Sequence, residues 1–103
     1  MDINELGHFS NPSLLILSSL AGGEKHGYAM MEDIYNMTGV RLGAGTLYGA
    51  ITRLEQAGLI EALPMGDRRR PYRLTAQGAA VLHQALAELE KFAGLGLKRL
   101  ATT

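Results

Sequence analysis

The sequence predicts a mainly α-helical fold with a small β hairpin and a long C-terminal helix. Apolar residues recur at helical spacing in four segments, and the pattern changes to two short strand candidates between residues 59 and 74. The chain has 103 residues, 47% of them apolar and 19% charged, which is typical of one globular domain.

A first helix is expected to begin at Asn11-Pro12-Ser13. Ser10 or Asn11 can cap it, because either side chain can accept hydrogen bonds from free backbone N–H groups, and Pro12 suits the first turn. The apolar run Leu14–Leu17 predicts burial on most sides, and Gly22-Gly23 is expected to end the helix.

Two further helices are expected to follow, joined by a short turn that contains glycine. The second covers residues 26 or 27 to about 38, and Gly39 fits the left-handed position that often ends a helix. The third covers residues 44–57, and its buried stripe is expected to consist of Leu47, Ile51 and Leu54.

A hairpin and a last helix complete the predicted domain. The strand candidates flank a Gly66-Asp67 turn, and Pro71 predicts that the second strand lies at an edge or starts late, because proline donates no ladder hydrogen bond. Thr75 can cap a helix that runs from Ala76 to about Leu100. We therefore divide the chain into a helix-and-hairpin part, residues 1–75, and a C-terminal helix, residues 76–103.

The composition excludes several classes of protein. The chain has no Cys, so a disulfide scaffold, a thiolate metal site and a cysteine nucleophile are excluded. No unbroken apolar run is longer than the four residues Leu14–Leu17, so no membrane span is expected. Asp2 and Glu5 stand where a signal peptide would carry basic residues, and a cytoplasmic location is therefore expected.

The charge is unevenly distributed along the chain. The formal net charge is zero, but residues 1–40 carry −4, residues 41–75 carry +3 and residues 76–103 carry +1. Because local charge decides what a surface binds, the basic middle segment favours nucleic acid as a partner.

Three helices, a hairpin and a long helix, in that order, describe a winged helix-turn-helix. The sequence also resembles the PadR family of transcriptional regulators, named for phenolic-acid-responsive repressors. The motifs that carry the resemblance are His26-Gly27-Tyr28, Gly45-Thr46-Leu47-Tyr48, Arg53-Leu54-Glu55 with Gly58-Leu59-Ile60, and Tyr72-Arg73-Leu74-Thr75 with Gly78. The resemblance runs from about Leu14 to the end of the chain, and the single C-terminal helix is similar to the short branch of the family.

Two features depart from the family pattern. Gly43-Ala44 stands where the family usually has Ser-Pro, and glycine is tolerated at a helix cap. Some short members hold flat aromatic drugs between Trp residues at the dimer interface, but this chain has no Trp, so that ligand mode is not carried over. No cofactor is expected, and the identity of any small-molecule effector is left open.

The exposed face of the third helix is the first predicted DNA contact. Its N-terminal N–H groups and the positive end of its dipole suit phosphate, and the arginine can reach phosphate or guanine. The resemblance implies that Tyr48 contacts the DNA backbone. The predicted contacts are Gly45, Thr46, Tyr48, Gly49, Thr52 and Arg53. The alternative is a helix that packs on another protein surface, with the tyrosine half-buried and the arginine solvated.

Arg68, Arg69 and Arg70, beside the predicted turn, are the second predicted DNA contact. Guanidinium groups fit phosphates through paired hydrogen bonds and are favoured in narrow minor grooves, although a run of three arginines can also be a solubilising surface. His26 is expected to cap and pack at a helix start. No metal site is predicted, because neither other histidine has ligand spacing to His26.

The last helix is expected to form a homodimer, because its apolar residues alternate in steps of three and four, as in a seam between helices. The predicted dimer residues are Leu14, Leu17, Leu82, Leu86, Leu89 and Ala93. The alternative is that this seam packs on the first helix of the same chain, and both can hold if Leu14–Leu20 join the same interface.

The sequence therefore predicts a homodimeric, sequence-specific double-stranded DNA-binding transcriptional regulator, acting as a repressor on a pseudo-palindromic operator. A winged-helix module that binds proteins and not DNA is the alternative. An enzyme is not expected, because no acid–base pair, nucleophile arrangement or metal set is found.

Overall fold

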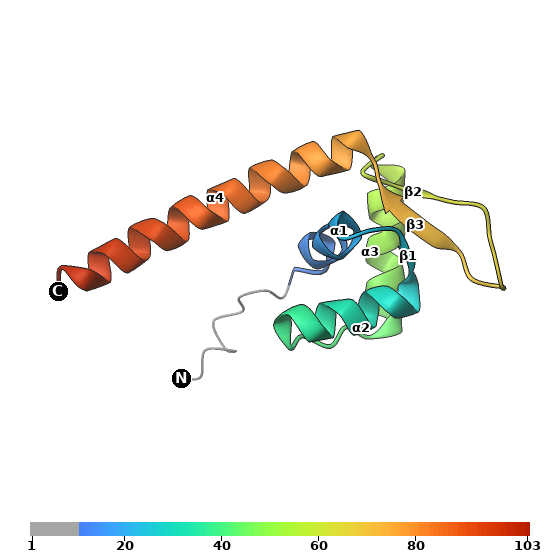
Figure 1. The fold of residues 1–103 in the computed structure, drawn as a ribbon, viewed down its shortest axis with the longest axis horizontal. Coiled ribbons are helices and arrows are strands. Elements are labelled where there is room, and N and C mark those ends of the chain that lie inside the picture. Colours follow the sequence, from blue (N-terminus) through green and yellow to red (C-terminus); the bar gives the residue numbers. More distant parts are fainter. Residues whose placement is uncertain (1–10) are drawn as a thin grey trace.

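The computed structural model describes residues 11–103, which form four helices and a small sheet around one core (Figure 1). The elements are α1 (Pro12–Ala21), β1 (Lys25–His26), α2 (Gly27–Thr38), α3 (Ala44–Gln56), β2 (Ile60–Ala62), β3 (Pro71–Leu74) and α4 (Ala76–Ala101). The predicted fold class is confirmed. The first three helices and the sheet form a body from which α4 extends as a long arm. Asp2, Glu5 and Ser10 lie outside the described residues.

Helix α1 lies at the centre of the core. Asn11 caps it, as predicted, because the Asn11 side-chain oxygen accepts hydrogen bonds from the N–H groups of Ser13 (3.0 Å) and Leu14 (3.2 Å). A cap of this kind contributes about 1 kcal/mol. The buried apolar residues of α1 are Leu15, Ile16, Leu17 and Leu20. Ser19 is also buried, and its hydroxyl donates to the Asp33 carboxylate (2.7 Å), so its polar group is satisfied.

Helices α2 and α3 form the helix-turn-helix, and their ends lie close to the predicted residues. Gly39 follows α2 with φ of 75°, a left-handed conformation that glycine adopts without steric cost. The buried stripe of α3 contains the three predicted residues together with Ala50. This stripe packs on α1, so the opposite face of α3 is turned away from the core.

The sheet has three strands in the order β1-β3-β2, so β3 is its central strand. Of the two alternatives predicted for the Pro71 strand, an edge position or a late start, the structure shows the late start. Pro71 is tolerated because it is the first residue of β3, where it pairs with His26 of β1. Sequence analysis missed β1, because two residues are too few to give a periodic pattern.

Thr75 and Gly78 fix the start of α4. The Thr75 side-chain oxygen accepts from the Gly78 N–H (3.0 Å), which is the predicted cap, and its hydroxyl donates to the Gly58 carbonyl (2.7 Å). The Thr75 N–H donates to the Leu59 carbonyl (3.1 Å). Gly78 is buried, and a Cβ at this position would lie 1.9 Å from the Leu59 carbonyl oxygen. The missing side chain thus lets α4 lie directly on the turn between α3 and β2.

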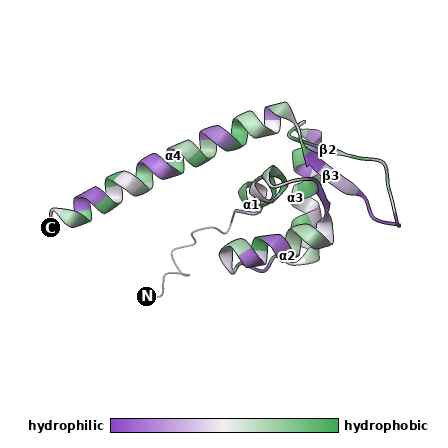
Figure 2. Ribbon diagram, viewed as in Figure 1, coloured by the Kyte–Doolittle hydropathy of each residue, from purple (hydrophilic) through white to green (hydrophobic). Residues whose placement is uncertain are grey.

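Beyond Leu82, α4 leaves the core and its apolar residues become exposed. Figure 2 shows apolar and polar residues mixed along this arm, and the exposed large apolar side chains include Leu86, Leu89, Phe92 and Leu95. Within residues 11–103, no helix combines the length and the apolar character that a membrane crossing requires. The arm therefore presents unpartnered apolar surface to solvent.

Candidate nucleic-acid interface

The outer face of α3 carries the residues predicted to contact DNA. Exposed on it are Gly45, Thr46, Tyr48, Thr52 and Arg53, while Gly49 is half-buried. Gly43, the residue before the helix, makes no side-chain cap hydrogen bond, so N–H groups of the first turn stay available. Free N–H groups and the helix dipole together make this end of α3 suitable for an anion.

The wing connects β2 to β3 and reverses direction at Asp67-Arg68. Gly66 and Arg69 exchange two backbone hydrogen bonds (2.9 and 3.2 Å) across this turn. Asp67 has φ of 48° and Arg68 has φ of 65°, the two successive left-handed residues of a type I′ turn, in which Asn-Gly is preferred. Arg68 is therefore at the tip of the wing, one residue beyond the turn that the sequence predicted.

The three wing arginines differ in their partners. Arg70 donates to the Leu63 carbonyl (2.8 Å), and Nη1 of Arg69 lies 3.1 Å from Nε2 of His26. Among residues 11–103, no hydrogen-bond or carboxylate partner is found for the exposed guanidinium of Arg68. Each guanidinium carries five N–H donors, so all three arginines retain donors for a phosphate.

A groove of about 330 Å³ joins the wing to the helix-turn-helix. Its lining includes Tyr48 of α3, Arg68–Arg70 of the wing, and Tyr28 at the start of α2. The structure thus brings Tyr48 and the three arginines onto one surface, although 20 residues separate them in the chain. Arg53, in the last turn of α3, is exposed but does not line the groove.

Tyr72 of β3 forms part of the groove lining. Burial raises the pKa of the Tyr72 phenol above its ordinary value of 10.0, and the negative charge of Glu55 adds to the rise, while Arg70 opposes it. Tyr72 therefore keeps its proton at neutral pH and presents a neutral hydroxyl to the groove.

Gly27 and Tyr48 are in unusually close contact. Gly27 is buried at the start of α2, and a Cβ at this position would lie 2.5 Å from Oη and 2.7 Å from Cζ of Tyr48. Carbon and oxygen atoms do not approach this closely without a bond, so the Tyr48 ring occupies space that any side chain at residue 27 would fill. Gly27 therefore determines where the Tyr48 hydroxyl lies in the groove.

Replacing Gly27 with alanine is expected to displace the Tyr48 ring while the fold persists, because the atom displaced is the end of a side chain. Alanine also favours the helix by about 0.5–1 kcal/mol over glycine. We expect the ring resonances of Tyr48 to shift in the NMR spectrum and affinity for duplex DNA to fall at least threefold. In a Tyr48→Ala background the same change should leave affinity within twofold. Equal losses in both backgrounds would contradict this account.

Sequence analysis did not find every residue of this surface. It predicted that His26 lies at the start of α2 in a cap position, and the structure places Nδ1 of His26 there, 3.2 Å from the Ala29 N, but it did not predict the contact with Arg69. Outside the groove lining, it also missed the cation–π contact in which the Arg41 guanidinium lies 4.0 Å from the centre of the Tyr35 ring. No local pattern signals the contact of His26 with Arg69, because it depends on how the chain folds back.

The residues predicted to form a dimer divide into two groups. Leu17 and Leu82 are each 5% exposed and pack in the core of their own chain, so the single chain already covers them, and their part in a dimer stays a prediction. Leu14 is half-buried and, with Leu86 and Leu89, lines an apolar groove of about 480 Å³. Ala93 is exposed.

A helix-turn-helix with a β wing beside its second helix defines a winged helix-turn-helix protein. The transcriptional regulator PadR-like family matches residues 16–84, which is more than half of the chain. The chain belongs to this family and is a transcriptional regulator.

Individual relatives agree with this assignment. Transcriptional regulator Rv3488 of Mycobacterium tuberculosis is 36% identical over 83 residues, 78% of this chain and 77% of Rv3488. A crystal structure of a PadR family transcriptional regulator from Eggerthella lenta superimposes with a TM-score of 0.78 at 30% identity, covering 98% of this chain and 90% of that one.

A third relative is much longer. An uncharacterised 37.1 kDa protein in transposon Tn4556 of Streptomyces fradiae is 38% identical over 85 residues, 82% of this chain. The match covers only 25% of that protein.

Proposed function

We propose that the chain binds double-stranded DNA as a homodimer and represses transcription from a pseudo-palindromic operator. The observation that carries this proposal is the groove in which Tyr48 of α3 lies beside Arg68–Arg70 of the wing. An exposed helix with free N-terminal N–H groups suits the major groove, and an arginine-tipped hairpin suits the phosphates and the adjacent minor groove.

The distribution of charge supports this surface over others. Six of the ten basic residues lie in residues 41–75, and only Arg73 of these pairs with a carboxylate, that of Glu61, within residues 11–103. The remaining five include all three wing arginines. A formally neutral protein therefore carries a local positive potential where the helix and the wing meet.

The arm formed by α4 supports self-association. Its exposed residues Leu86 and Leu89 line the apolar groove together with Leu14, so a second copy would cover surface that a single chain leaves in water. A two-fold dimer would present two α3 helices to the same side of the duplex, with half-sites about 10–10.5 base pairs apart or a multiple of that spacing.

Repression is the mode we propose, because a dimer that occupies a promoter blocks polymerase without any further contact. Selection of bound duplexes from random DNA at moderate salt tests the DNA proposal. We expect a two-fold symmetric motif whose half-sites follow the spacing above. Recovery of no motif, with weak binding even at low salt, would favour the protein-binding alternative.

The replacement Leu86→Glu tests the homodimer. A carboxylate at this 44% exposed seam position would be buried in the proposed interface, so the dimer dissociation constant is expected to rise more than tenfold. Leu95→Glu is the matched control, since Leu95 is 47% exposed and two and a half turns away, on the opposite side of α4. Sedimentation velocity over a range of concentrations measures both. Equal dissociation by the two variants would contradict a seam at Leu86.

A further inference from the structure

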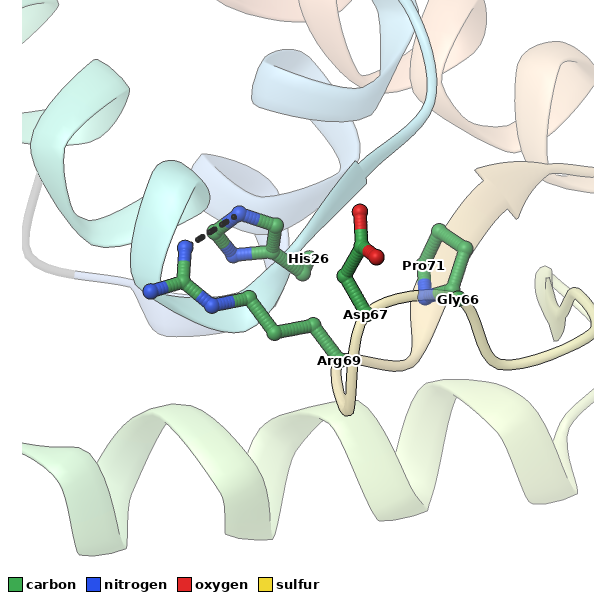
Figure 3. Close-up of a pocket in the computed structure, with 5 residues that line it drawn as sticks. All are labelled: His26, Gly66, Asp67, Arg69 and Pro71. Carbon is green, nitrogen blue, oxygen red and sulfur yellow. Dashed lines mark hydrogen bonds between the residues drawn. The ribbon is translucent and has the colours of Figure 1, made fainter.

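His26 contacts both the start of α2 and the wing through a single imidazole ring. Nδ1 lies 3.2 Å from the Ala29 N, in the position of a cap on α2. Nε2 lies 3.1 Å from Nη1 of Arg69. Figure 3 shows the Arg69 side chain reaching across from the wing to this ring, with the Asp67 carboxylate lining the same pocket.

Each of the two contacts requires an unprotonated nitrogen on the imidazole ring, and a neutral ring has only one. A guanidinium has donors and no acceptor, so Arg69 requires a lone pair on Nε2. The backbone N–H of Ala29 is also a donor, so it requires a lone pair on Nδ1. A neutral imidazole has one protonated and one unprotonated nitrogen, and an imidazolium has no free lone pair at all. The ring can therefore satisfy Ala29 or Arg69, but not both at once.

We propose that His26 is a positioning residue for the wing, with two mutually exclusive states. In the wing-locked state Nδ1 carries the proton and Nε2 accepts from Arg69, while the helix cap is open. In the capped state Nε2 carries the proton, Nδ1 accepts from Ala29, and Arg69 is released. Charge-assisted hydrogen bonds are roughly twice as strong as neutral ones, so the wing-locked state is the majority in the free protein.

This arrangement deepens the proposed function and, in its DNA-bound part, rests on it. When a DNA phosphate binds the Arg69 guanidinium, Nε2 no longer has to accept a hydrogen bond. The ring proton can then lie on Nε2, and Nδ1 accepts the hydrogen bond from the Ala29 N–H. The bond that Arg69 leaves is partly replaced by the weaker cap bond within the protein, so releasing the arginine to DNA costs less than losing that bond outright. DNA binding and the Nε2–H form of His26 are thereby linked.

The tautomer can be read directly on the full chain. Long-range ¹H–¹⁵N NMR spectra distinguish Nδ1–H from Nε2–H, and a pH of about 8 keeps ordinary histidines neutral. We expect mostly Nδ1–H for His26 in the wild type and less than a tenth of that form in Arg69→Ala. Arg68→Ala is the matched control, because it removes the neighbouring charge but not the contact, and it should leave the tautomer unchanged. His83, on α4, is an internal reference.

Amide exchange at Ala29 provides an independent measurement. Removing Arg69 closes the cap, so exchange of the Ala29 N–H is expected to slow at least threefold in Arg69→Ala and to stay unchanged in Arg68→Ala. A wild type already in the Nε2–H form, with tautomer and exchange indifferent to Arg69, would overturn the proposal. So would equal changes in the two variants, which would indicate a general charge effect.

Adding duplex DNA separates this proposal from the function on which it rests. With the selected duplex, the wild-type tautomer is expected to shift to Nε2–H. If DNA binds but His26 stays Nδ1–H, the link between release of Arg69 and closure of the cap is wrong. If no duplex binds, the proposed function fails, while the measurements on the free protein still decide whether His26 positions the wing.

Discussion

Replacing Arg68, Arg69 and Arg70 together with alanine is expected to weaken binding to duplex DNA by roughly 10- to 1000-fold at moderate salt, because up to three phosphate contacts are lost. Each neutralised phosphate adds about 0.9 to the slope of log affinity against log salt, so that slope should become shallower by up to about 2.7. The loss should be similar for different DNA sequences, since these residues are proposed to contact the phosphate backbone, which carries no sequence information. Fluorescence anisotropy titrations over a series of salt concentrations measure both quantities.

The matched control replaces Lys91, Lys98 and Arg99 with alanine, which changes the net charge by the same amount on the exposed arm of α4. This variant is expected to keep affinity within about threefold and to keep the salt slope. Similar losses in the two triple variants would show that only overall charge matters, and the wing would then have no specific role. A wing variant that loses no affinity would favour the protein-binding alternative.

Gly78→Ala is expected to destabilise the protein by about 3 kcal/mol or more, a large part of the stability of a small domain. The new Cβ would lie 1.9 Å from the backbone carbonyl oxygen of Leu59, so α4 must move away from the turn between α3 and β2. That movement also strains the hydrogen bonds of Thr75 to Gly58 and Leu59. The midpoint and slope of urea unfolding measure the effect.

Gly94→Ala is the control for this prediction, because it makes the same substitution in the same helix. Apart from the adjoining backbone of α4, no atom of residues 11–103 lies within 4 Å of a Cβ at residue 94, so alanine should stabilise α4 by about 0.5–1 kcal/mol. The two variants are thus expected to move stability in opposite directions. A loss of less than 1 kcal/mol for Gly78→Ala would contradict the tight packing of α4 on Leu59.

The helices could be predicted from the sequence because their signals are local. Asn11, Gly39 and Thr75 act at helix ends through hydrogen bonds or backbone conformations that involve only a few neighbouring residues. The buried stripe of α3 follows from the helical repeat, which also identified its exposed face. Such features do not depend on the rest of the chain.

Features that depend on long-range packing could not be predicted. The strand β1 is only two residues long, and it exists because β3 folds back against it. For the same reason β3 became central, against the expectation for a strand that contains Pro71. Leu82 continues the seam of α4 without any change in pattern, yet it enters the core because Gly78 lets the start of α4 approach the body.

The candidate site shows the same division. The residues on α3 and on the wing could be selected by type and spacing, but the placement of Tyr48 and the wing arginines around one groove required the fold. The roles of Gly27 and His26 were hidden, since one acts by lacking a side chain and the other through Arg69, 43 positions further along the chain.

The left-handed pair Asp67-Arg68 has a consequence for engineering. A residue other than glycine in this conformation loses roughly 1–2 kcal/mol, and glycine in place of Arg68 would recover much of it. A screen for heat resistance would therefore select the very substitution that, under the proposed function, a screen for operator affinity would discard. The proposed role of Arg68 thus opposes thermal stability to recognition at this one position, and attempts to stabilise the protein should begin elsewhere, for example at Gly94.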